Sequence, residues 1–166
     1  MLEKPSLLLR PWSLPSVGAA GGRMRTIADS AGAAVGFVAD VKPQTSRWLR
    51  WLSPRTLEVY ETPDQSLVFT LRRGWGWLTA WHLVDADDRL VGTFRGRALL
   101  DGFGHFLAVI EPPDDLGCGR FLAVEGRELG EYALEPHQTK VTFAAELEGN
   151  PFARMLLLGA VLVRQA

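Results

Sequence analysis

The chain has 166 residues, of which 47% are hydrophobic, and its formal net charge is −1. This length fits a single domain over residues 1–166 with a sizeable core. The near-neutral charge argues against a nucleic-acid-binding protein, which normally has a strongly basic domain. The single cysteine, Cys118, cannot form an internal disulfide, so we expect a reducing, cytoplasmic setting.

The first half of the chain is a series of predicted β-hairpins. Residues 24–28 and 33–39 form one hairpin, and residues 56–60 and 66–71 form the next. Residues 78–84 and 89–95 form a third, whose return strand places Leu90 and Phe94 on one face. Residues 47–52 interrupt this pattern and fit either a helical turn or a loop. With the strands that follow, the chain holds roughly twelve strands, spaced as in an all-β sandwich or barrel.

Two of these hairpins share a sequence pattern. Asp29 and Asp85 each open a turn, and a Val-Gly pair ending at Gly36 or Gly92 follows in the return strand. Either the hairpins are an internal repeat, or the pattern reflects only the general preference of turns for Asp and Gly.

The last strand has a period of two. We predict that its apolar residues point into the core, because a slip of one residue would place them all in water. The expected inward residues are Val141, Phe143, Ala145 and Leu147, and the expected outward residues are Lys140, Thr142 and Glu146.

The end of the chain predicts a buried helix. Residues 155–163 contain no polar side chain, and Asn150 and Pro151 suit the N-cap and the first helical position. A helix that is apolar on every face must be buried all round, and this one is too short to cross a bilayer. No other stretch is long enough to be a transmembrane segment. We therefore predict a mainly β fold in which a sheet closes around the C-terminal helix.

Together these features resemble the phospholipid scramblase and LURP-one-related families of the Tubby C-terminal-like superfamily. The residues that carry the resemblance are 67–73, which end on Arg72 and Arg73, residues 81–92 with their acidic turn, and the apolar C-terminal helix. The resemblance covers nearly the whole chain and implies a closed twelve-stranded barrel around a buried helix. No close match to the scramblase calcium-binding segment occurs, and the basic headgroup residues of Tubby domains do not map onto particular positions.

For function, the resemblance implies a non-enzymatic binding or scaffold module that meets phospholipid headgroups at a membrane surface. Such a protein would be cytoplasmic and peripheral to the membrane. The alternative is a small-molecule-binding protein or an enzyme that uses a pocket in the barrel or at its mouth. A buried helix argues against the alternative, because a filled barrel has no spare cavity.

A cluster of tryptophan and arginine residues is the candidate lipid-binding site. Indole rings favour the membrane–water interface and guanidinium groups favour lipid phosphates, so this cluster fits an anionic phospholipid surface. The opposing interpretation is that the tryptophans are packed against the barrel or its mouth, and that the arginines beside them are ordinary solvent-exposed residues. The candidate residues are Arg47, Trp48, Arg50, Trp51, Arg72, Arg73 and Trp75.

No catalytic residue, metal site or cofactor is predicted. Asp85, Asp87 and Asp88 lack the glycine and glutamate that an EF-hand needs at its sixth and twelfth positions, so we interpret them as an acidic turn. The histidines lack the spacing of a zinc motif, and Cys118 lies in a glycine-flanked turn. Neither a phosphate-binding loop nor a dinucleotide fingerprint is present.

Overall fold

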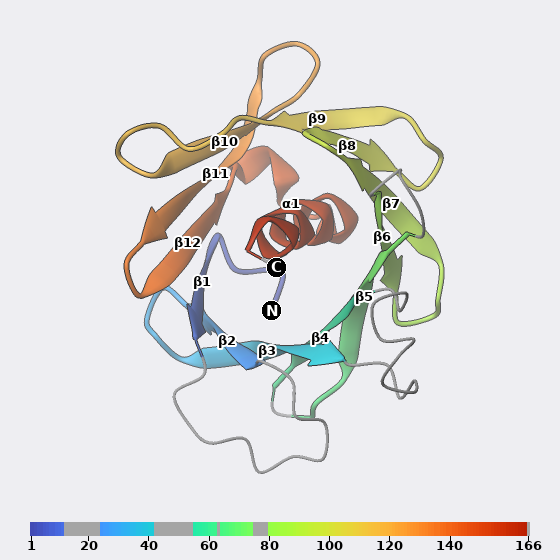
Figure 1. The fold of residues 1–166 in the computed structure, drawn as a ribbon. Coiled ribbons are helices and arrows are strands. Elements are labelled where there is room, and N and C mark those ends of the chain that lie inside the picture. The colour runs from blue at the N-terminus through green and yellow to red at the C-terminus, as the bar shows by residue number, and fades with distance from the viewer. Residues whose placement is uncertain (12–23, 42–54, 63, 75–79, 166) are drawn as a thin grey trace, which may run out of the picture.

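The computed structural model describes residues 1–11, 24–41, 55–62, 64–74 and 80–165. Within these residues, twelve antiparallel strands pair in chain order, and β12 pairs back with β1 to close a barrel (Figure 1). The strands are β1 (Ser6–Pro11), β2 (Met24–Asp29), β3 (Ala34–Val41), β4 (Thr56–Glu61), β5 (Leu67–Arg73), β6 (Trp81–Asp85), β7 (Leu90–Arg95), β8 (Ala98–Asp101), β9 (Phe106–Ile110), β10 (Cys118–Leu122), β11 (Glu128–Glu135) and β12 (Gln138–Phe143). The predicted closed twelve-stranded barrel is confirmed.

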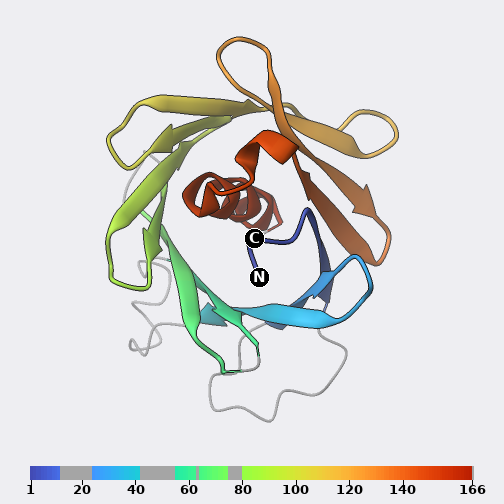
Figure 2. The same cartoon turned by 180° about the vertical axis from the view of Figure 1, so that it is seen from behind.

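The helix α1 (Pro151–Arg164) lies inside the barrel, as both views show (Figures 1 and 2). It begins as predicted, because the Asn150 side chain accepts a hydrogen bond of 3.1 Å from the backbone N–H of Ala153. Leu157, Leu158 and Leu162 are 0% exposed. Each fully buried leucine stabilises the fold by roughly 2 kcal/mol. The helix therefore provides the core around which the sheet closes.

Close contact between helix and wall depends on glycines. A Cβ atom on Gly92 of β7 would lie 2.3 Å from the Leu100 carbonyl oxygen and 2.5 Å from Leu156 Cδ2 of α1. On the helix side, a Cβ on Gly159 would lie 2.9 Å from Leu83 Cδ1. At Gly92 the obstacle is a backbone oxygen, so a larger residue requires a shift of the backbone. At Gly159 the nearest atom is the end of the Leu83 side chain, which would have to move to admit a Cβ.

The last strand is shorter than predicted. Val141 and Phe143 are buried and Lys140 is exposed, as expected, but β12 ends at Phe143. The chain then forms a 3₁₀ turn, η1 (Ala145–Leu147), in which Ala145 is exposed and Leu147 is buried. The prediction that Ala145 points inward was wrong, because here the chain leaves the wall and turns back into the barrel.

The prediction that Leu90 shares a face with Phe94 was also wrong. The register between β6 and β7 shifts between Leu83 and Val84, so that Val84 pairs with Leu90 and Val91 becomes the extra residue of a β-bulge. Leu90 is 47% exposed, whereas Val91 and Phe94 are buried. The same irregularity occurs in the β2–β3 hairpin, where Ala28 pairs with Ala34 and Val35 is the extra residue.

Among the described residues, Arg154 is the only buried charged side chain. It lies in the first turn and a half of α1, where its Nη1 donates to the carbonyl of Leu2 at 2.7 Å. Its guanidinium carbon lies 5.4 Å from the centre of the Phe143 ring, a cation–π contact. Arg154 thus ties the start of the helix to the first residues of the chain.

The helix distinguishes the two ends of the barrel. At the helix-start end, where α1 begins, lie the turns β2–β3, β4–β5, β6–β7, β8–β9 and β10–β11. At the helix-exit end, where α1 finishes, lie the described turns β7–β8, β9–β10 and β11–β12. There Gln165 is held by Arg25 of β2, whose Nη2 donates to the Gln165 carbonyl at 2.8 Å.

Candidate functional site

The predicted lipid-binding cluster is only partly covered by the structure. Arg72 and Arg73 are exposed residues at the end of β5, on the helix-exit end. The other predicted members lie outside the described residues: Arg47, Trp48, Arg50, Trp51 and Trp75. Their role in lipid binding stays a prediction.

The strand topology relates the two parts of this cluster to one end of the barrel. Val41 pairs with Thr56, and Thr56 pairs in turn with Arg72, so the strand ends that flank residues 42–54 lie beside Arg72. Gly74 and Ala80, which flank residues 75–79, belong to the same end because adjacent strands are antiparallel. The chain thus leaves and re-enters the barrel at the helix-exit end for each of these sequences.

Arg72 makes an ion pair on the barrel surface. Its Nη1 lies 2.8 Å from Oδ1 of Asp88, and both side chains are more than half exposed. An exposed ion pair of this kind contributes only about 0–1 kcal/mol, because water and salt screen the attraction. The guanidinium of Arg72 can therefore exchange this carboxylate for another anion at little cost.

Charge is divided unequally between the two ends of the barrel. At the helix-exit end, the described cations Arg10, Arg25, Arg55, Arg72, Arg73, Arg95, Arg97 and Arg164 outnumber the carboxylates Asp40, Glu111, Asp114, Asp115 and Glu135. At the helix-start end, the carboxylates Glu3, Asp29, Glu61, Asp64, Asp85, Asp87, Asp88, Asp101, Glu125, Glu128, Glu146 and Glu148 outnumber the cations Lys4, Arg89, Arg127 and Arg154. The two ends therefore favour partners of opposite charge.

One turn geometry recurs around the barrel. Asp29, Asp85, Asp101 and Asp114 each accept backbone N–H bonds at Oδ1 from the residues two and four positions later, at 2.8–3.0 Å. The residue three positions later has a positive φ, which favours glycine, and is Gly32, Asp88, Gly104 or Gly117. The Asp-Gly pattern of the sequence thus corresponds to a repeated turn. Asp85 opens such a turn, in agreement with the interpretation of Asp85, Asp87 and Asp88 as an acidic turn.

Two of these aspartates titrate below their ordinary range. Loss of hydration acts to raise the pKa of Asp101, but the N–H groups of His105 and Phe103 and the His105 side chain outweigh it, so that the pKa is lowered. The pKa of Asp29 is lowered in the same way, with Ala33 and Lys4 as the main donors acting against desolvation. Both groups are therefore carboxylates near neutral pH.

A lowered pKa makes these turns sensitive to acid. The stability from each carboxylate is fully present above the unfolded-state pKa of 3.8 and is lost as the pH falls through the lower folded-state value. Asparagine keeps the acceptor oxygen but does not titrate. We expect the melting temperature of the double variant Asp29→Asn, Asp101→Asn to fall less than that of the wild type between about pH 7 and about pH 2. Parallel melting curves across this range would contradict the assignment.

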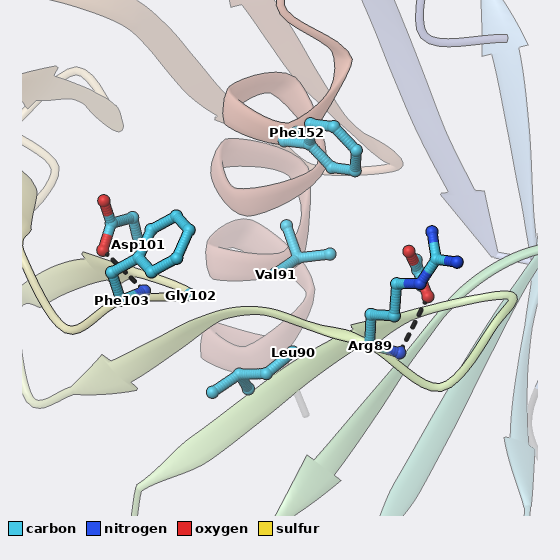
Figure 3. A pocket seen from close by; sticks show the side chains of 8 residues that line it. Arg89, Leu90, Val91, Asp101, Gly102, Phe103 and Phe152 are labelled. Carbon is cyan, nitrogen blue, oxygen red and sulfur yellow. Dashed lines mark hydrogen bonds between the residues drawn. The ribbon is translucent and has the colours of Figure 1, made fainter.

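A pocket of about 290 Å³ opens at the helix-start end, between the β6–β7 and β8–β9 turns. Figure 3 shows Phe152 of α1 above Val91, with Phe103 on one side and Arg89 on the other. Gly102 lets the two turns approach, because a Cβ there would lie 2.4 Å from the Leu90 carbonyl oxygen. The remaining lining residues are Asp85, Leu90 and Asp101. Sequence reasoning missed this pocket, since it depends on the bulge at Val91.

The pocket offers little for catalysis. Its carboxylates, Asp85 and Asp101, are engaged through Oδ1 by the backbone of their own turns. The described residues include no group of three or more His, Cys, Asp or Glu side chains placed to hold a metal ion. Among the residues that the structure describes, no helix is both long enough and apolar enough to cross a membrane.

The architecture defines a class of closed, twelve-stranded antiparallel barrels with a helix through the centre. The solved structure of the Arabidopsis thaliana protein AT5G01750 is similar to this chain, with a TM-score of 0.59. The similarity covers 96% of this chain and 93% of the other, at 11% sequence identity, and so concerns the fold alone. No family model and no curated protein matches the chain.

Proposed function

We propose that this chain is a non-enzymatic binding module of the scramblase and LURP-one-related type, and that it meets phospholipid headgroups on an anionic membrane surface. The contact is made by the helix-exit end, through Arg72, Arg73 and the tryptophan-containing sequences that join the strands there. On this proposal the protein works in the cytoplasm as a peripheral membrane protein.

The observation that carries the proposal is the position of α1. Leu156, Leu157, Leu158, Val161 and Leu162 are all 2% exposed or less, so helix side chains occupy the space in which a barrel would hold a ligand. Partners must then bind on the outer surface or at the ends. This favours a binding module over an enzyme or small-molecule carrier that uses the barrel interior.

Charge supports the choice of end. The described cations gather at the helix-exit end, and Arg72 and Arg73 lie exposed on it. The sequence between Val41 and Arg55 adds Lys42, Arg47 and Arg50 and contains no carboxylate. Each cation near an anionic leaflet contributes about 1 kcal/mol, so several together with inserted tryptophans give reversible attachment.

The test is co-sedimentation with phosphatidylserine-containing vesicles. We expect the double variant Arg72→Glu, Arg73→Glu to bind at least roughly tenfold more weakly than the wild type, because two attractive charges become repulsive. Binding of the wild type should also fall as salt is raised from low ionic strength, since the Debye length shortens.

The matched control reverses the same number of charges at the opposite end. Arg89 and Arg127 are exposed arginines of the helix-start end, and the double variant Arg89→Glu, Arg127→Glu should bind vesicles like the wild type. Circular dichroism checks that both variants fold. Equal loss in the two double variants, or no binding by a folded wild type at low salt, would refute the lipid proposal.

A further inference from the structure

The helix-start end carries an apolar surface that the membrane proposal does not use. The exposed large apolar side chains at this end are Leu90, Phe103, Phe106, Val124 and Phe152, whereas Leu116 and Leu134 lie at the other end. Leu90, Phe103 and Phe152 come from three separate elements and meet around the pocket, with buried Val91 between them. Convergent exposed apolar side chains of this kind mark interaction sites.

Phe103 is not required by the turn in which it lies. It is 89% exposed and occupies the position two residues after Asp101. The same position in the turns opened by Asp29, Asp85 and Asp114 is filled by Ala31, Asp87 and Leu116. An aspartate serves this turn as well as a phenylalanine does, so turn geometry gives no reason for an aromatic ring in water.

The pocket has the size and shape of an anchor site. Its volume of about 290 Å³ lies near the lower limit for small-molecule pockets, which are roughly 300–1,000 Å³, and accommodates one large side chain. Its walls are mostly apolar, with Asp85, Arg89 and Asp101 also in the lining, and Gly102 forms part of the lining without a side chain to fill it. Anchor side chains in such pockets dominate the affinity of many protein interfaces.

The charge around the pocket determines the kind of partner. The two turns that frame it carry Asp85, Asp87, Asp88 and Asp101, against Arg89 in the same turns and Arg72, which reaches Asp88 from β5. An anionic membrane is repelled by such a surface, and an acidic peptide is repelled as well. A basic segment is attracted and its encounter accelerated.

We propose that the helix-start end is a docking site for a basic peptide segment of a protein partner, and that an aromatic or branched aliphatic side chain of this segment enters the pocket between Val91, Phe103 and Phe152. Lysine or arginine residues on either side of the anchor face Asp85, Asp87 and Asp101. The pocket lies at the opposite end of the barrel from the proposed lipid contact, and the two surfaces meet only at the ion pair between Arg72 and Asp88.

The experiment is a selection from a phage-displayed random dodecapeptide library on the full chain, after depletion on the Phe103→Ser variant. We expect enriched peptides with one aromatic or aliphatic anchor among lysines and arginines. As synthetic peptides they should bind Phe103→Ser about tenfold more weakly than the wild type in fluorescence polarisation. Asp87→Lys, a second variant at an exposed turn position, should also weaken binding, with a loss that shrinks as salt is raised.

Leu116→Ser is the matched control. Leu116 occupies the same turn position as Phe103, is 85% exposed and lies at the helix-exit end, so this variant should bind the peptides like the wild type. The proposal is overturned if no selected peptide depends on Phe103, if the enriched peptides are acidic, or if Leu116→Ser weakens binding equally. Phe103-dependent binding to neutral phosphatidylcholine vesicles, without peptide binding, would instead assign this end to a membrane.

Discussion

Replacing Leu157 by aspartate should unfold the barrel. Leu157 is 0% exposed at the middle of α1, packed among leucines of the same helix and the inner wall. An aspartate there would place a carboxylate without a partner in the core, and we expect a loss of more than about 4 kcal/mol of stability. The measurement is chemical denaturation followed by tryptophan fluorescence, with circular dichroism to detect remaining β-structure.

The control for this change is Leu116→Asp. Leu116 is 85% exposed in the β9–β10 turn, so the same substitution should alter stability by less than about 0.5 kcal/mol. A Leu157→Asp protein that remains soluble and melts cooperatively near the wild-type temperature would show that α1 is not the core of the fold.

Gly92→Val should give the second large effect. The added Cβ would lie 2.3 Å from the Leu100 carbonyl oxygen, a backbone atom that cannot rotate away, and 2.5 Å from Leu156 Cδ2. We expect destabilisation of about 3 kcal/mol or more, because either β8 or α1 must shift. For a chain of this length, this corresponds to a fall in melting temperature of roughly 6–12 °C.

Ala34→Val provides the comparison, since Ala34 is an exposed residue at the start of β3. Valine favours strands, so this variant should melt within a few degrees of the wild type. If Gly92→Val were equally harmless, the close contact between β7, β8 and the helix would not be needed for stability.

The sequence was most informative where one physical signal dominated. The apolar run from Met155 to Val163, preceded by Asn150 and Pro151, predicted the helix and its burial, and the closed barrel followed from the need to cover it. Alternation in β12 predicted that Val141 and Phe143 face inward, and both are buried. These predictions depend on periodicity and end signals, which are local properties of the chain.

Features that depend on register or on distant contacts were missed. The bulge at Val91 moves Leu90 out of the core, and no residue in β7 signals it except the neighbouring Gly92. Arg154 is buried because Leu2 offers its carbonyl and Phe143 its ring, and both partners are far away in the sequence. The pocket at Phe103 combines such effects, because it needs the bulge, the paired turns and the helix start together.

For the candidate lipid site, the sequence indicated the residues and the structure indicated the end of the barrel to which their flanking strands belong. Composition alone singled out the tryptophan and arginine residues, but the strand order was needed to see that the flanking strand ends belong to one end of the barrel. The same order reveals the acidic character of the other end. The structure shows an excess of cations at one end and of carboxylates at the other, and the two proposals assign these ends to different partners.

One experiment tests directly whether the two ends have separate roles. The Trp48→Ala, Trp51→Ala variant and the Phe103→Ser variant are compared with the wild type for co-sedimentation with phosphatidylserine-containing vesicles at low salt. We expect the double tryptophan variant to lose most of its binding, because the cations alone attract the membrane only weakly and the indole rings supply the rest of the binding free energy. Phe103→Ser should sediment like the wild type. Equal binding by all three proteins, or a loss confined to Phe103→Ser, would contradict a membrane contact at the helix-exit end.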